Sequence, residues 1–422
     1  MPATPTGATH EVPPEDLFFS TTDSRGVIDE ANEVFVRNAR YSREDLIGAP
    51  HSIIRHPDMP AGVFASMWDM LGEGRPVCAY VRNLAGDGSS YWAFATITPI
   101  DGDRYLSVRS GPVNFEARDL LSGLYQSLRE QERAARAAGR SAHEVGMLGR
   151  ALLGEALRDQ GFADYDELQL DLVPVEVAAR EGGAVEVPTE VGDPGADALL
   201  AEIATLRAEL GVFADAVGAS LAGVDGLRRD LRRARAHLAE LDELIDDEES
   251  RERIVAASRA VEDTWPVLDE VMARRKRLRL TTAIARLQAE AIARFVAAAV
   301  AGREDLPSSR HAAESLTAAL GSIVDADVAA DQQAASALTA RIRSGLDALR
   351  AIPMHLLAAA PDTAGLMTVL DALVGQSERI RSGIDAVIGP DTTLDLDDLK
   401  VRLNRIDELA AAWAPSGEDD PV

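Results

Sequence analysis

One short segment of the chain holds most of the side chains that are equipped for chemistry. Residues 51–60 (HSIIRHPDMP) place two imidazoles, one guanidinium and one carboxylate close together, and Trp68 follows. Arginine and histidine can donate hydrogen bonds to anionic or carbonyl oxygens, and an indole can stack on a planar ring. These residue types suit a ligand site. Composition alone nevertheless favours a plain loop, in which Asp58 caps the next helix and Arg55 is solvated.

Short apolar runs separated by turns surround this segment, between residues 17 and 112. Eleven of the 19 aromatic residues fall between Phe18 and Tyr105, which indicates a compact domain lined with aromatic side chains. Gly, Asp and Ser clusters delimit strands, whereas a capping Ser42 and a first-turn Pro60 open helices. The pattern predicts strands at 77–83, 91–99 and 105–109 and helices at 31–40, after Ser42 and at 60–71. With two earlier strands, this order predicts an α+β domain with an antiparallel sheet.

Residues 17–112 resemble a PAS domain of the kind found in aerotaxis receptors. The resemblance rests mainly on Pro50-His51 and the RHPDMP run at 55–60, followed by Phe64 and Met67-Trp68. It also includes the segments 20–23, 31–32, 35–36, 41–48, 81–83 and 91–92, with Gly74 and Pro76. All of these positions lie within the first 112 residues, so the resemblance concerns the N-terminal domain alone.

That family binds FAD noncovalently and reports the redox state of the cell, so the resemblance implies a flavin site. The positions that match the family's flavin-site pattern are Asn32, Arg55, His56, Asp58 and Trp68. The sequence departs from the family at three places. Residues 77–79 (VCA) replace a Trp-x-Gly, residues 85–90 (AGDGSS) replace a basic, asparagine-rich turn, and Arg40 replaces a usual glycine. These departures concern the surroundings of the cofactor rather than the fold.

The single cysteine and the histidines of residues 51–60 suggest two other cofactor chemistries. A photoreactive flavin–cysteine pair needs a cysteine in the helix beneath the ring, whereas Cys78 falls in an expected strand and is expected to be a small buried residue. Haem ligation through His51 or His56 is the second alternative. The chain has too few cysteines for a multi-cysteine metal site and contains no nucleotide-binding or hydrolase motif. We therefore expect neither a metal site nor an enzyme.

Helix-period sequence continues from residue 114 to near the C-terminus. It predicts helices at 116–138, 142–160, 251–301 (with a break at Trp265-Pro266), 309–350, 362–388 and 394–413. Prolines, glycines and valines at 173–196 predict a linker. The expected organisation is a flexible tail (1–16), the PAS domain (17–112), a helical connector (113–172), the linker (173–196), long helices (197–301), a C-terminal helical bundle (309–413) and a tail (414–422).

Residues 199–245 carry an unbroken heptad repeat. Thirteen of its 14 a and d positions, from Leu199 to Ile245, are apolar, and Ser220 is the exception. Such a repeat predicts a coiled-coil seam, and β-branched residues at a with leucines at d favour a parallel homodimer. An antiparallel hairpin within the chain, against residues 251–301, buries the same seam. The periodicity alone leaves both arrangements open.

Charge and hydropathy restrict the binding partners and the cellular location that we expect for the protein. The chain has 43 Lys plus Arg and 70 Asp plus Glu, which gives a net charge of −27. This balance argues against nonspecific binding to nucleic acid or to anionic membranes. The N-terminus lacks the features of a secretory signal, and the most apolar stretch, 291–301, is too short to span a membrane. We therefore expect a cytoplasmic protein without a membrane span.

Together these features predict a soluble PAS-domain signal-transduction sensor. Bound FAD would report redox, oxygen or energy state, and the helical region would pass a conformational change to a downstream signalling protein that the sequence does not identify. Three alternatives stay open: an aerotaxis or chemotaxis transducer whose signalling tip is degenerate at 280–300, a haem-binding PAS sensor, and a cofactor-free dimerisation scaffold.

Overall fold

The computed structural model describes residues 3–100, 104–184, 186–302, 328, 330–353, 356, 364–388 and 396–413. The chain divides into two compact units. The first comprises Met1–Leu210, Ala283–Ile323 and Leu396–Val422, and the second comprises Gly211–Thr282 and Val324–Asp395. The predicted tail at 414–422 and part of the predicted helix at 309–350 lie outside the described residues.

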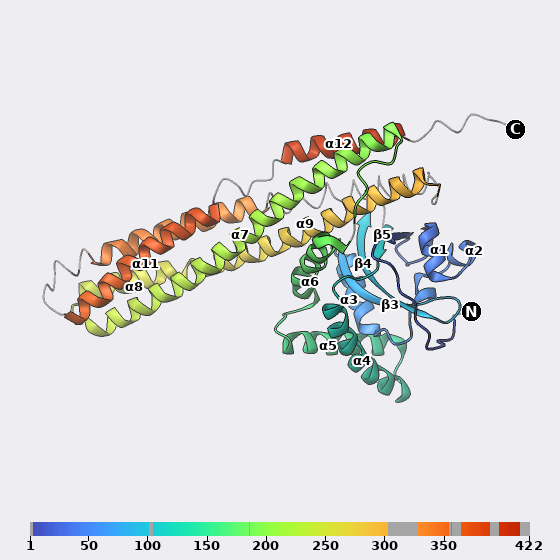
Figure 1. The fold of residues 1–422 in the computed structure, drawn as a ribbon. Helices are drawn as coiled ribbons and strands as arrows, with labels where there is room; N and C mark the ends of the chain where they lie inside the picture. Colours follow the sequence, from blue (N-terminus) through green and yellow to red (C-terminus); the bar gives the residue numbers. More distant parts are fainter. Residues whose placement is uncertain are drawn as a thin grey trace. The chain divides into compact units, whose positions relative to one another are not determined.

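The first unit contains a five-stranded antiparallel sheet with the strand order β2-β1-β5-β4-β3 (Figure 1). Its strands are β1 (Phe18–Thr22), β2 (Ile28–Ala31), β3 (Val77–Leu84), β4 (Ser90–Ile100) and β5 (Arg104–Ser110). The register pairs Arg82 with Trp92 and Phe18 with Arg109. The α+β prediction, with short helices between the early and late strands, is confirmed.

Short helices connect β2 to β3: α1 (Glu33–Ala39), α2 (Arg43–Leu46), the 3-10 helix η1 (His51–Ile54) and α3 (Ala61–Gly72). Their starts follow the local sequence. The predicted cap Ser42 accepts a hydrogen bond from the Asp45 backbone N–H at 3.2 Å, and Pro60 precedes the first residue of α3. Pro60 makes no side-chain cap, and α3 begins directly after it, beside β3 of the sheet.

Arg40 ends α1 in a left-handed conformation, with φ of 54°. Side chains other than glycine rarely adopt this region. The Arg40 guanidinium forms an ion pair with Asp87 and donates to Ser89 Oγ at 3.1 Å, so the turn before β4 holds the strained residue in place. The acidic turn at 85–90 thus provides the partner for an arginine at a position where the family usually has glycine.

We expect Arg40→Gly and Arg40→Ala to differ in stability because only glycine relieves the backbone strain. Both variants lose the exposed ion pair, which contributes at most ~1 kcal/mol. Arg40→Gly should therefore be more stable than Arg40→Ala by about 1 kcal/mol. Urea unfolding measures the difference, and equal midpoints for the two variants would contradict the strain argument.

The N-terminal segment is not the flexible tail that the sequence predicted. Thr6 N–H donates to Gly88 O at 2.9 Å, His10 N–H donates to Ser90 O at 3.0 Å, and Val12 is buried. The prolines of this segment prevent a regular strand but leave enough N–H groups to bond the turn that precedes β4. The prediction of a tail at 1–16 is therefore wrong for the residues from Thr6 onward.

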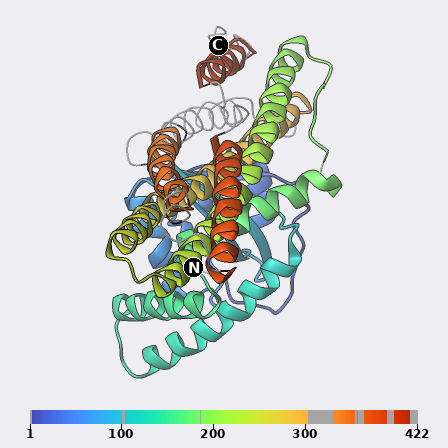
Figure 2. The same cartoon turned by 90° about the vertical axis from the view of Figure 1, so that its left-hand side faces the viewer.

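Three helices follow the sheet: α4 (Phe115–Ala137), α5 (Ala142–Asp159) and α6 (Tyr165–Ala179), with a π-helical turn, η2 (Arg180–Ala184), after α6. The first two confirm the predicted helices, and they lie side by side in both views (Figures 1 and 2). The predicted linker at 173–196 is wrong over its first half because α6 continues through Pro174. Glu176 and Arg180, both buried with polar partners, hold this stretch against the domain.

All of the heptad seam except Ile245 lies on α7 (Pro194–Leu244), and its a and d side chains are buried within a single chain. In the second unit, seam residues from Val224 to Ile245 belong to one apolar core. The core also includes residues of α8 (Glu248–Glu262), the start of α9 (Trp265–Val300), the helical segment 330–353 and α11 (Ala364–Ile388). The predicted break at Trp265-Pro266 is confirmed. The seam is therefore used inside the chain, and the parallel homodimer that it favoured is not needed to bury it.

α12 (Leu396–Trp413) belongs to the first unit, where Arg402 contacts Glu202 at 2.8 Å and Glu209 at 2.7 Å. Among the described helices, α7 is long and apolar enough to cross a membrane by length and composition. This is weak evidence, because core helices of soluble proteins meet the same criterion. It is not the stretch at 291–301 that the sequence singled out.

Candidate functional site

A cavity of about 250 Å³ lies between the sheet, α3 and residues 50–55 of the first unit. Aliphatic and aromatic side chains make most of its wall. Its polar lining residues include Thr22, His51, Arg55, Asn83, Ser107 and Arg109. A mostly apolar cavity with a few converging polar groups is typical of small-molecule sites.

Arg109, on β5, brings a buried positive charge to this wall. Its guanidinium donates to Ser20 Oγ at 3.2 Å and to His51 Nε2 at 2.6 Å, and it lies 5.3 Å from the centre of the Phe35 ring. No carboxylate of the described residues forms an ion pair with it. Burial lowers the pKa of Arg109 to about 10. The cavity therefore favours a ligand with electron-rich or anionic atoms near Arg109.

His51 is neutral in this arrangement. Burial, reinforced by the charge of Arg109, lowers its pKa well below the ordinary value, and its Nε2 accepts the hydrogen bond from Arg109. The imidazole stacks on Phe35, with a centre-to-centre distance of 6.0 Å. His51 thus orients Arg109 rather than presenting a free nitrogen to the cavity.

Two further polar side chains in the wall have unmatched hydrogen-bonding atoms. Within the described part of the chain, Asn83 Nδ2 and Ser107 Oγ are buried and complete no hydrogen bond, although Asn83 lies near the Tyr91 hydroxyl. Buried polar atoms without partners are uncommon in folded proteins, and a bound ligand is one way to satisfy them. An amide donor, a hydroxyl and a guanidinium in one wall suit a ligand that carries carbonyl groups on one edge.

Two of the predicted site residues line the cavity. Arg55 donates to Met59 O at 2.9 Å and lies 4.1 Å above the Phe64 ring, and burial lowers its pKa to about 10. Trp68 projects from α3 and packs edge-on against Tyr105, with ring centres 5.6 Å apart. Its side chain is 38% exposed, so it lies at the border between cavity and solvent.

The other three predicted site residues, Asn32, His56 and Asp58, do not line the cavity. Asn32 caps α1: its Oδ1 accepts from Phe35 N–H at 3.1 Å and from Phe19 N–H at 3.2 Å. His56 is buried, with Nδ1 accepting from the Asp58 backbone N–H at 3.1 Å. Asp58 pairs with Arg82 at 3.2 Å and Arg133 at 2.6 Å. These side chains shape the loop and the helix ends around the cavity, and none of them is among its lining residues.

The sequence analysis did not assign Asn83, Ser107 or Arg109 to the site. Strand alternation could have found them, because side chains two residues apart point to the same face. On β3, Asn83 follows Val77, Ala79 and Val81 on the cavity face, as Arg109 follows Tyr105 and Ser107 on β5. The signal was present, but it required knowing which face of the sheet encloses the cavity.

Cys78 lies on β3 between cavity-lining positions and is not part of the cavity wall. It is fully buried, and burial raises the pKa of its thiol far above the ordinary value. Since Cys78 is the only cysteine of the sequence, no cysteine can reach a ligand in the cavity to form an adduct. The described residues also contain no group of three or more potential metal ligands.

A buried carboxylate on α4 positions the cavity helix α3. Glu132 accepts hydrogen bonds from the Ala61 and Gly62 backbone N–H groups at 2.8 and 2.9 Å, so it caps the start of α3 from another helix. α3 crosses α5 where Gly62 meets Gly149; a Cβ on Gly62 would lie 2.1 Å from the Gly149 carbonyl carbon. The orientation of Trp68 therefore depends on α4 and α5.

Comparison with known proteins identifies a PAS fold in the N-terminal part of the chain. Residues 28–108 match the family model of the PAS fold. Over 118 residues the chain is 35% identical to the aerotaxis receptor of Escherichia coli (strain K12), covering 27% of this chain and 23% of the receptor. Over 94 residues it is 28% identical to Phototropin-2 of Oryza sativa subsp. japonica, covering 22% of this chain and 10% of that protein.

Among solved structures, the light-state structure of the blue-light photoreceptor Aureochrome1 LOV matches with a TM-score of 0.23 and 19% identity, over 25% of this chain and 90% of that chain. The chain spans less than a quarter of the length of either curated relative. The family match and the order of the strands in the sheet both indicate that the N-terminal domain has the PAS fold. Residues 28–108 are a PAS domain, similar in sequence to the aerotaxis receptor, and a mainly helical region follows it.

Proposed function

We propose that the PAS domain is the input of a signal-transduction sensor and that its cavity binds a flavin, FAD by resemblance to the aerotaxis receptor family. The observation that carries this proposal is the buried Arg109, which has no carboxylate partner among the described residues and lies in the same wall as the unmatched Asn83 and Ser107. A flavin ring has an apolar end and an opposite edge with carbonyl groups. That distribution suits a cavity with apolar walls and donors on one side.

When bound, a flavin supplies reversible one- and two-electron chemistry. The residues of this chain would do the rest. Asn83 and Arg109 would donate hydrogen bonds to the polar edge, Arg55 would add a second positive charge, and Trp68 would cover the ring at the border with solvent. His51 would keep Arg109 in place. A change in ligand charge would alter these hydrogen bonds, which is the kind of local event that biases a two-state element.

The haem alternative receives less support from the same residues. Ligation by His51 would require Nε2, which already accepts the hydrogen bond from Arg109, and His56 is not a lining residue. The empty-scaffold alternative leaves the buried Arg109 without a role. The non-enzymatic role, the cytoplasmic location, a homodimer and an unidentified downstream signalling protein remain part of the proposal.

Trp68→Ala tests the flavin site. The substitution should weaken flavin binding by about 1–3 kcal/mol, or roughly 5- to 150-fold in Kd, because it removes a large planar contact. Arg55→Ala should have an effect of similar size because it removes a charge-assisted contact. Titration of full-length protein with FAD and with FMN, followed by flavin fluorescence, gives the affinities.

Trp92→Ala is the matched control, because Trp92 lies on β4 of the same domain but does not line the cavity. It should leave the flavin affinity within about twofold of wild type, because it removes no contact with the cavity. Failure of the full-length protein to bind either FAD or FMN at concentrations up to their solubility would refute the proposed function. A Soret band in the purified protein would favour haem instead.

A further inference from the structure

The last part of α9 packs on the sheet face opposite the cavity. Gln288 Nε2 donates to Thr98 Oγ1 on β4 at 3.1 Å, and both groups are buried. The Phe295 ring meets Phe19 of β1 edge-on, with ring centres 5.1 Å apart. Thr98 neighbours the cavity-lining Ile97, so alternation along the strand places a cavity contact and an α9 contact on adjacent residues.

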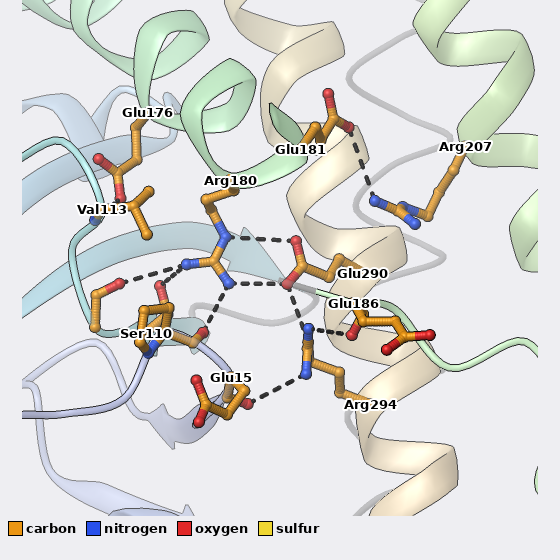
Figure 3. Close-up of polar contacts among 12 residues, drawn as sticks. Glu15, Ser110, Val113, Glu176, Arg180, Glu181, Glu186, Arg207, Glu290 and Arg294 are labelled. Carbon is orange, nitrogen blue, oxygen red and sulfur yellow. Dashed lines mark hydrogen bonds and ion pairs between the residues drawn. The ribbon is translucent and has the colours of Figure 1, made fainter. Parts of the chain in front are cut away.

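Arg180 is the largest fully buried side chain of the described residues, and it joins four segments (Figure 3). Its guanidinium donates to Ser110 Oγ of β5 at 2.9 Å and to Pro14 O of the N-terminal segment at 2.9 Å. It also donates to Glu290 Oε1 of α9 at 2.8 Å and to Gly111 O at 3.4 Å. Arg180 itself begins η2, immediately after α6.

Glu290 completes the pair from α9. Arg294 donates to Glu290 Oε1 at 3.0 Å and to Glu186 O at 2.7 Å, as Figure 3 shows. Burial pushes the pKa of Glu290 upward, but the hydrogen bond and charge of Arg180 outweigh it and hold the pKa below its ordinary value. The carboxylate is therefore ionised and fully hydrogen-bonded, which makes the pair sensitive to small displacements of either side.

The ion pair is linked to the cavity through consecutive residues of β5. Arg109 points into the cavity, and Ser110 accepts from Arg180 on the other side. Because the two residues share a peptide bond, a displacement of the Arg109 backbone also shifts Ser110. We call Ser110, Arg180 and Glu290 the β5–α9 junction.

We propose that the β5–α9 junction couples the state of the cavity to the packing of α9 residues 283–300 on the sheet, so that α9 is the first output element of the sensor. The inference rests on the proposed function for the identity of the ligand. The family match ends at residue 108, so it assigns no role to Arg180 or Glu290. Because coupling between two sites is reciprocal, a change at the junction must also change ligand affinity.

Amide hydrogen exchange of residues 283–300 in the full-length protein tests the coupling. Saturation with FAD should change the exchange rates in this segment by about fivefold or more, the lower end of typical couplings. In the Arg180→Gln/Glu290→Gln double variant, the difference should fall below about twofold, and the Kd for FAD should shift by about fivefold or more. Arg402→Gln, which removes a partly buried arginine on α12 with two glutamate partners, should leave both quantities unchanged.

An unaltered Kd together with an unaltered exchange difference in the double variant would overturn the coupling while leaving the proposed function intact. The same holds if wild-type protein binds FAD without any change at 283–300. Should the double variant fail to fold, Ser110→Ala removes one hydrogen bond and keeps the ion pair. It should shift both quantities in the same direction, and no shift would again overturn the coupling.

A ligand-free comparison separates this inference from the proposed function. Arg109→Gln should change the exchange rates of residues 283–300 without any flavin, whereas Arg104→Gln on the same strand should not. If wild-type protein binds no flavin, the proposed function fails, and this comparison still decides the coupling. Equal exchange at 283–300 in the two variants would refute it.

Discussion

Replacing Gly149 by alanine should lower the free energy of unfolding of the first unit by about 3 kcal/mol, the upper end for overpacking. A Cβ at this position would lie 2.1 Å from Glu132 Oε1 and 2.8 Å from the Gly62 backbone N. Glu132 cannot move aside easily, because its two oxygens accept hydrogen bonds from the start of α3. The helices α3 and α5 must separate, and the cap of α3 must be disturbed.

Gly146→Ala is the control for this prediction. Gly146 lies on α5 as well, but no atom approaches within 4 Å of the position that its Cβ would take. Alanine should stabilise the helix there by about 1 kcal/mol, so the two variants should differ in sign. Urea unfolding followed by circular dichroism measures both. Equal stability of the two variants would mean that the α3–α5 crossing relaxes freely.

Replacing Arg109 by methionine should weaken flavin binding by about a hundredfold while leaving the ligand-free protein equally stable or more stable by about 1–3 kcal/mol. The reason is that Arg109 is buried without a carboxylate partner among the described residues, and a buried cation of this kind carries an uncompensated desolvation cost. A ligand with an electron-rich edge turns the same charge into a favourable contact. The substitution should therefore lower the affinity for flavin without lowering the stability of the ligand-free protein.

The pH dependence of this effect has a definite sign. Because the pKa of Arg109 is lowered to about 10 in the folded protein, the desolvation cost is fully present below pH 10. It diminishes as the pH rises through the folded pKa toward the ordinary value of about 12.5. Wild-type and Arg109→Met protein should thus differ by a constant amount between pH 6 and pH 8. Thermal unfolding of both proteins across this range checks the expectation.

Arg104→Met provides the control, since Arg104 lies on the same strand and pairs with Asp29 at the surface. It should change stability by less than ~1 kcal/mol and leave flavin affinity unaltered. If Arg109→Met instead lowered the stability of the ligand-free protein by several kcal/mol, Arg109 would be a structural residue held by Ser20, His51 and the aromatic rings. The cavity would then lack the charge signal on which the proposed function rests.

The local features of the PAS domain followed from the sequence because they depend on near neighbours. Ser42 and Pro60 start helices where expected, and the strands β3, β4 and β5 begin and end within one residue of the predicted bounds. Turn residues, caps and alternation act over a few positions, so they can be recognised without knowledge of the fold. The compact α+β domain and the position of the chemically rich segment were therefore accessible from the sequence.

The helical region shows what periodicity cannot decide. The heptad repeat from Leu199 to Ile245 correctly predicted a continuous buried face. It could not choose between another copy of α7 and helices of the same chain, because either partner removes the same apolar area from water. The cores that bury this face within the chain involve segments more than a hundred residues away, such as α11. Only the tertiary structure brings them together.

The candidate site also has some features that the sequence predicted and others that only the tertiary structure decided. From the sequence alone, residues 51–60 and Trp68 were predicted to form a ligand site of a PAS-like domain, and His51, Arg55 and Trp68 line the cavity in the structure. The tertiary structure decided that Arg55 and Trp68 line the cavity whereas Asn32, His56 and Asp58 support its surroundings. It also decided that Arg109 supplies the buried charge and that Ser110 joins β5 to Arg180 and Glu290. The physical reason is that the direction of a side chain depends on which face of the sheet is covered and by what, and long-range packing sets both.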